Sequence, residues 1–102
     1  MANSKFGGIG ISGEKTVSAA GTAEALGTVS ANPERYKSLT IIAKATNTNN
    51  VYLGGSDVAS TTNDGLPALA SLTLQSEYGF LLSEVYIDVD TSGEGVDFYA
   101  AY

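Results

Sequence analysis

The sequence predicts an all-β fold: a single small antiparallel β-sandwich or jelly roll, preceded by a flexible N-terminal arm. Three observations support this prediction. No segment shows sustained helical periodicity, whereas the alternation of apolar and polar residues that is typical of strands appears repeatedly. Turn-forming Gly, Asn, Asp and Ser separate about seven such segments, as in sandwiches and jelly rolls. The 102 residues are enough for one domain with one hydrophobic core.

The first 14 residues are expected to form the arm, and residues 15–102 the sandwich domain. The arm contains a Gly-rich run, residues 7–11, whose weak patterning does not offset the cost of ordering the backbone. We therefore expect the arm to be dispensable for the fold. Its apolar side chains, Phe6, Ile9 and Ile11, are candidates for contact with a partner.

The first half of the domain contains one clear strand. Two short strands are expected at residues 16–20 and 24–29, followed by a loop or a single helical turn. Residues 36–46 then alternate clearly, because side chains along a strand point to opposite faces. The predicted core face of this strand carries Leu39, Ile41, Ala43 and Ala45.

The second half repeats the pattern. A short strand at residues 51–53 leads into a long polar loop, residues 56–68, and a strand around Leu72 and Leu74. Residues 82–90 form the next clear strand, and a hairpin at residues 91–95 precedes the last one. The predicted inward side chains are Val85, Ile87, Val89, Val96, Phe98 and Ala100, and the predicted outward ones are Glu84, Tyr86, Asp88 and Asp90.

The composition excludes most catalytic chemistry. The chain has no histidine and no cysteine, which excludes Ser-His-Asp and Cys-His nucleophiles, imidazole and thiolate metal sites, and disulfides. Asp88 and Asp90 share a predicted strand face about 7 Å apart, but such a pair is too common to indicate a glycosidase. Residues 88–94 resemble the opening of a calcium loop, yet Tyr99 stands where the closing Glu belongs. We expect a non-enzymatic protein without a metal or other cofactor.

Charge is distributed unevenly along the chain. All five basic residues lie within the first 44 positions, whereas positions 45–102 hold eight acidic residues and no basic one. This balance argues against a nucleic-acid partner. Two interpretations of the uneven charge remain open: an acidic surface that keeps the protein soluble, or charge complementarity between neighbouring subunits. With no long apolar run and no secretory h-region, the chain is expected to be soluble, synthesised in the cytoplasm and without a membrane partner.

Three tyrosines, Tyr52, Tyr86 and Tyr99, are predicted to lie opposite the core face. Tyrosine is enriched at interfaces because it offers a large, rigid contact area. The alternative is that both faces of the sheet are covered within the monomer. If Tyr86 and Tyr99 lie on neighbouring strands, they form a patch that can meet the basic half of a second copy, which suits a cyclic homo-trimer.

Six stretches of the chain are, in order, Thr22–Gly27, Ser38–Ala43, Asn50–Val58 (NVYLGGSDV), Gly65-Leu66, Ser71–Leu74 (SLTL) and Val85–Asp88 (VYID). In this order they resemble small structural proteins of tailed bacteriophages. The resemblance covers roughly residues 16–100 and implies a β-sandwich on a virion lattice. A capsid decoration (cement) protein on the head surface is the leading expectation, with the major capsid protein and other copies as partners. Asp57, in the long loop, is a further candidate contact. A tail, baseplate or fibre module and a carbohydrate-binding sandwich are the alternatives.

Overall fold

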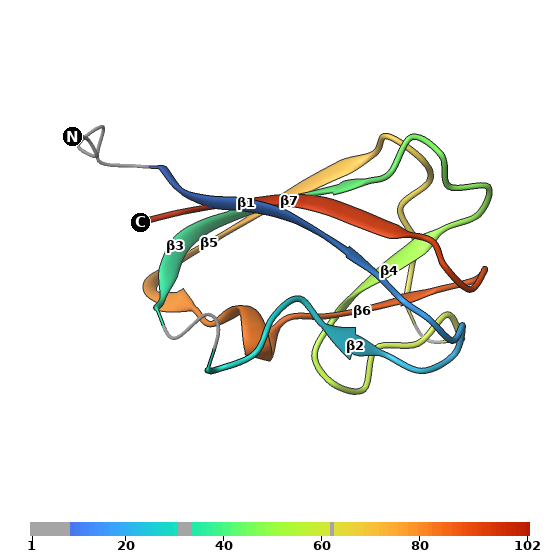
Figure 1. The fold of residues 1–102 in the computed structure, drawn as a ribbon, viewed down its shortest axis with the longest axis horizontal. Coiled ribbons are helices and arrows are strands. Elements are labelled where there is room, and N and C mark those ends of the chain that lie inside the picture. The colour runs from blue at the N-terminus through green and yellow to red at the C-terminus, as the bar shows by residue number, and fades with distance from the viewer. Residues whose placement is uncertain (1–8, 31–33, 62) are drawn as a thin grey trace.

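Two antiparallel sheets face one another in the structure (Figure 1), a computed structural model that describes residues 9–30, 34–61 and 63–102. A four-stranded sheet has the order β1-β7-β3-β5, and a three-stranded sheet has the order β2-β6-β4. The expectation of an all-β sandwich is therefore confirmed. No helix among the described residues is long and apolar enough to cross a membrane.

The strands are short, and all the pairs between them are antiparallel. The larger sheet contains β1 (Ile9–Thr16), β3 (Tyr36–Ala43), β5 (Ser71–Phe80) and β7 (Gly95–Ala101). The smaller sheet contains β2 (Glu24–Ala25), β4 (Val51–Gly54) and β6 (Tyr86–Val89), and a single 3₁₀ turn, η1 (Leu82–Glu84), precedes β6.

The core lies between the sheets and follows the predicted alternation. From the larger sheet, Leu39 and Ile41 of β3 and Val96 of β7 are fully buried, and Phe98 and Ala100 of β7 are buried beside them. From the smaller sheet, Ile87 of β6 is fully buried. All six side chains predicted to point inward after residue 82 are buried. Of the four predicted for the core face of residues 36–46, only Ala45 is exposed, because it lies in the turn after β3.

The connection between β6 and β7 is not the predicted hairpin. β6 pairs with β2 and β4, whereas β7 pairs with β1 and β3, so residues 90–94 cross from one sheet to the other. Hydrogen bonds to the end of β1 fix this crossing: the Val17 N–H donates to the Glu94 carbonyl (2.9 Å), and the Gly93 N–H donates to the Val17 carbonyl (2.8 Å).

The predicted arm boundary at residue 14 is wrong. Residues 9–16 form β1, which pairs with β7. The glycines that suggested flexibility instead permit close packing, because a Cβ at Gly10 would lie 2.5 Å from the Ala100 carbonyl oxygen and one at Gly13 would lie 2.8 Å from the Phe98 ring. Residues 1–8, and Phe6 among them, lie outside the described residues.

Other boundaries also differ from the prediction. Residues 17–20, expected in a strand, form a turn, and the strand expected at 24–29 is reduced to β2. β5 runs further than expected, but its register breaks, since Tyr36 pairs with Phe80 whereas Ser38 pairs with Gln75. Residues 76–79 therefore bulge opposite Lys37, with the Tyr78 side chain 87% exposed.

Candidate docking face on the four-stranded sheet

The most distinctive surface is the outer face of the four-stranded sheet, which we call the outer face. In Figure 1 the smaller sheet lies on one side of the larger one, and no described element covers the other side. Strand alternation places short polar side chains there in a cross-strand row. Ser12 is opposite Tyr99, Tyr99 is opposite Thr40, and Thr40 is opposite Thr73.

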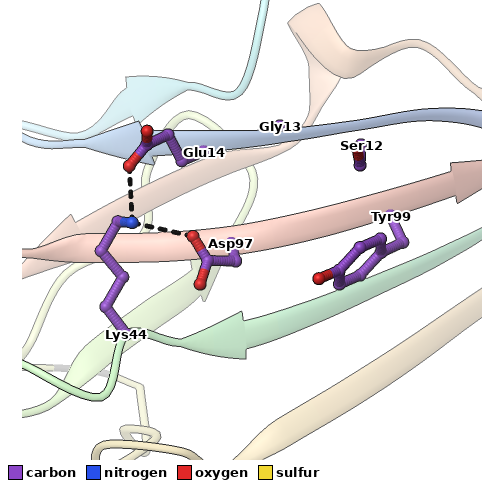
Figure 2. Close-up of a pocket in the computed structure, with 6 residues that line it drawn as sticks. All are labelled: Ser12, Gly13, Glu14, Lys44, Asp97 and Tyr99. Carbon is purple, nitrogen blue, oxygen red and sulfur yellow. Dashed lines mark hydrogen bonds and ion pairs between the residues drawn. The ribbon is translucent and has the colours of Figure 1, made fainter.

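Tyr99 stands between two shallow hollows on this face. Its side chain is 54% exposed. One hollow, of about 280 Å³, lies toward the charged end of the face and is drawn in Figure 2. The other, of about 420 Å³, is lined mainly by small side chains. Tyr99 lines both hollows and is the largest side chain in each. The lining of the second hollow is Gly10, Ile11, Ser12, Ser38, Thr40, Tyr99, Ala100 and Ala101.

An ion-pair cluster closes one end of the outer face. The Lys44 Nζ lies 2.6 Å from Glu14 Oε1 and 2.8 Å from Asp97 Oδ1 (Figure 2). Hydrogen bonds to Asp97 and then to Glu14 raise the pKa of Lys44, so it is held as a cation. One cation between two carboxylates leaves a net charge of −1 on the cluster. The cluster links β1, β7 and the end of β3, and it marks the face with a fixed pattern of charge.

Tyr52, predicted as an exposed contact, is buried with 7% of its surface exposed. Its hydroxyl donates to Asp90 Oδ2 at 2.8 Å, and this bond is the first cause of the raised pKa of Tyr52. The long loop packs over the ring, since a Cβ at Gly65 would lie 2.8 Å from Tyr52 Cε1. The prediction was wrong because strand alternation does not reveal that a loop covers the other face of the sheet.

The predicted pairing of Tyr86 with Tyr99 is also wrong. Tyr86 is half-buried in β6, opposite Ala25 and Gly54, whereas Tyr99 lies in β7 of the other sheet. The patch of two adjacent tyrosines, from which a homo-trimer was predicted, is therefore absent, because Tyr86 and Tyr99 lie in different sheets. The order of any oligomer stays a prediction.

The other candidate contacts are scattered. Ile9 pairs with Ala101 at the start of β1, and Ile11 packs against the core while lining the larger hollow, so neither belongs to a free arm. Asp57 is exposed in the long loop. Of the proposed residues, Ile11 and Tyr99 meet at the outer face.

Asp88, expected to point outward, is 1% exposed. Its Oδ1 accepts hydrogen bonds from the Gly21 N–H (2.9 Å) and from the Val89 N–H (2.8 Å). The turn that contains Gly21 therefore folds over the side of β6 that was expected to face solvent. Asp90 is exposed, so the two carboxylates do not share the open face on which a catalytic pair was considered.

Sequence reasoning did not identify Ser12, Thr40 and the Lys44 cluster as neighbours of Tyr99. Alternation alone places Thr40 and Lys44 on one face of their strand, but only the order of the strands brings β1 and β7 beside them. No family model, no curated protein and no solved structure matches the chain.

Proposed function

We propose that this chain is a non-enzymatic structural protein of a bacteriophage virion, of the capsid decoration (cement) type. It binds the lattice of the major capsid protein on the head surface and stabilises the assembled shell. The observation that carries the proposal is the open outer face, with Tyr99 exposed among small polar side chains. The resemblance of the sequence to small phage structural proteins supplies the class of partner.

The chemistry of the outer face suits contact with another protein. Short side chains such as Ser12 and Thr40 allow the backbone of a partner to approach closely, and their hydroxyls supply hydrogen bonds. Tyr99 supplies a rigid anchor of the kind that is enriched at interface centres. The Lys44 cluster lies at one end and favours one orientation of the partner, because charged groups select register more than they add affinity.

A modest energy per copy is sufficient for this role. Tyr99 is about half exposed, so covering it removes roughly 100 Å² of mostly apolar surface. At about 25 cal/mol per Å² this contributes roughly 2–3 kcal/mol before association costs. Many copies on one shell add such contributions, since a ligand that binds the assembled state stabilises that state.

Co-sedimentation tests the proposal. Capsids of the encoding phage, prepared without this chain, are incubated with the purified wild type, with Tyr99→Ser and with Val29→Ser. Val29 is 61% exposed in the loop after β2, so its variant removes an exposed apolar side chain outside the outer face. We expect the wild type and Val29→Ser to sediment with capsids in lattice stoichiometry, and Tyr99→Ser to bind about tenfold or more weakly.

Thermal melting of each variant shows whether it is folded, and an exposed tyrosine is expected to leave the midpoint nearly unchanged. Attachment to tails or fibres instead of heads would assign the chain to another part of the virion. Specific binding on a glycan array without binding to capsids would favour the carbohydrate-binding alternative. Equal capsid binding by wild type and Tyr99→Ser would show that the outer face is not the docking surface.

A further inference from the structure

The free edge of β5 is a second surface with an organised pattern. Among the described strands β5 pairs with β3 alone, and residues 71–75 follow β3 in regular register. The Ala43 N–H donates to the Ala70 carbonyl, and the Lys44 N–H donates to the Gly95 carbonyl. Alternate residues of β3 therefore bond to β5 and to β7 in turn, which directs the backbone groups of Ser71, Thr73 and Gln75 away from β3.

This edge lacks the usual protection against pairing. Natural edge strands carry charges, prolines or bulges that block the approach of another strand. The stretch Ser71-Leu72-Thr73-Leu74-Gln75 has neither charge nor proline, although the chain has a net charge of −6. The bulge at residues 76–79 ends the regular stretch but does not interrupt it. Leu72 is 41% exposed, so apolar surface accompanies the free backbone groups.

We propose that residues 71–75 pair antiparallel with the same segment of a second copy, around a twofold axis at Thr73. The two four-stranded sheets then become one continuous sheet. The pairing does not use Tyr99, so it goes beyond the proposed docking function and can fail or succeed independently of it.

The segment is complementary to itself in this arrangement. Thr73 lies opposite Thr73 of the second copy, Ser71 opposite Gln75, and Leu72 opposite Leu74. The outward backbone groups of Ser71, Thr73 and Gln75 meet as hydrogen-bonded pairs, each of which exchanges two hydrogen bonds. Threonine pairs and aliphatic pairs across strands are stabilising.

Charge also permits the contact. Glu77 follows the paired stretch, and a twofold axis at Thr73 places it at the opposite end from Glu77 of the second copy. The acidic residues nearest to the edge therefore do not face one another, and no like charges meet within the paired stretch. An arbitrary strand of another protein lacks this built-in match of Leu72 with Leu74, which favours a second copy as the occupant.

A five-residue edge is smaller than the standard interface, so the dimer is expected to be weak. Sedimentation velocity over a range of concentrations is the first measurement. We expect a monomer at low micromolar concentration and a mass twice that of the monomer near millimolar concentration. Thr73→Lys places like charges opposite each other at the axis and is expected to weaken dimerisation at least tenfold. Thr16→Lys makes the same change on β1, the other edge of this sheet, and is expected to have no effect.

Crosslinking supplies an independent readout, because the chain has no cysteine of its own. A short bis-maleimide is expected to join Thr73→Cys into a dimer at high concentration and to leave Thr16→Cys monomeric. A chain that stays monomeric up to millimolar concentration overturns the proposal. A trimer would also overturn it. So would a dimer that persists in Thr73→Lys, provided that this variant melts at the wild-type temperature and is therefore folded.

Discussion

Asn47 holds the backbone of Gly95 through two hydrogen bonds in the buried interior. The Asn47 side-chain N–H donates to the Gly95 carbonyl (2.8 Å), and the Gly95 N–H donates to Asn47 Oδ1 (3.3 Å). The side chain thus adds to the backbone contacts at the point where β7 begins, where the Lys44 N–H also donates to the Gly95 carbonyl (3.1 Å) and Gly95 pairs with Thr16 of β1. No side chain fits at Gly95, since a Cβ there would lie 1.9 Å from the Lys15 carbonyl oxygen. The pair therefore adds a fixed contact at the start of β7, the strand that carries Tyr99.

Replacing Asn47 by Ala is expected to lower the free energy of unfolding by about 1–3 kcal/mol, because the buried Gly95 N–H loses its partner, whereas the Gly95 carbonyl keeps its bond from the Lys44 N–H. Asn49→Ala is the control, since Asn49 is exposed and its side chain bonds only at the surface, to Thr91. Urea denaturation measures both variants. A loss for Asn47→Ala no larger than that for Asn49→Ala would show that the buried pair contributes little.

Gly10→Ala tests whether β1 is part of the folded domain. The added Cβ would lie 2.5 Å from the Ala100 carbonyl oxygen and 2.6 Å from the Tyr36 ring. Such overpacking costs about 1–3 kcal/mol and lowers the thermal midpoint by several degrees in a domain of this size. Gly55→Ala is the matched control, because its nearest contact, at 3.6 Å to Asp57, is ordinary packing. If Gly10→Ala melts at the wild-type temperature, β1 does not pack tightly in solution, and the prediction of a flexible arm up to residue 14 would stand.

The sequence predicted the inward faces of the long strands but not the partners of those strands. Alternation is local, so it placed Leu39, Ile87 and Phe98 in the core correctly. The hydrogen bonds that send residues 90–94 across to the other sheet join positions far apart in the chain, and no local pattern encodes them. Glycine is ambiguous for the same reason: in β1 it allows close packing, and only the neighbouring strand reveals this.

The candidate site was predicted only in part. Tyr99 was placed correctly because its face of β7 is open. Tyr52 and Asp88 were expected to be exposed by the same reasoning, but a loop covers one and a turn covers the other. Alternation separates two faces of a strand, and burial of the second face depends on segments whose paths are set by tertiary contacts.

Acid is expected to weaken the link between Glu94 and the turn after β3. The Glu94 carboxylate accepts hydrogen bonds from the Thr48 N–H (2.7 Å), the Thr48 hydroxyl (2.8 Å) and the Asn49 N–H (3.2 Å). These bonds, the Thr48 backbone bond first, lower the pKa of Glu94 from its usual 4.5. The carboxylate therefore contributes stability above about pH 4.5, and this contribution is lost as the pH falls through the lowered pKa.

Glu94→Gln is the variant that isolates this effect. We expect its urea midpoint to lie below that of the wild type at pH 7, and the difference to shrink at about pH 3. Glu77→Gln, on the exposed bulge, controls for the loss of one negative charge. A difference between wild type and Glu94→Gln that is constant from pH 7 to pH 3 would contradict the role of the ionised carboxylate.

High pH is expected to break the contact of Tyr102 with Glu34 at the end of the chain. The Tyr102 hydroxyl donates to the Glu34 carboxylate, and the Tyr102 ring lies 5.3 Å from the ring of Tyr36. Ionisation of Tyr102 would break the hydrogen bond and place two negative charges together, which raises the pKa of Tyr102 to about 12. A raised pKa means that the contact stabilises the fold fully below pH 10, the usual tyrosine value, and is lost as the pH rises through about 12.

Phenolate absorbance during alkaline titration measures this contact. Glu34→Gln removes the negative charge, so we expect Tyr102 to shift from the late part of the titration toward pH 10, and Tyr36, whose pKa the same carboxylate also raises after the effect of burial, to shift in the same direction. Tyr102→Phe removes the step of Tyr102 and so identifies it among the tyrosines with a raised pKa, which also include Tyr36 and Tyr52. Glu84→Gln is the control, because Glu84 is exposed and makes its ion pair with Arg35 instead. A titration curve that Glu34→Gln leaves unchanged would show that the carboxylate does not hold the Tyr102 proton in solution.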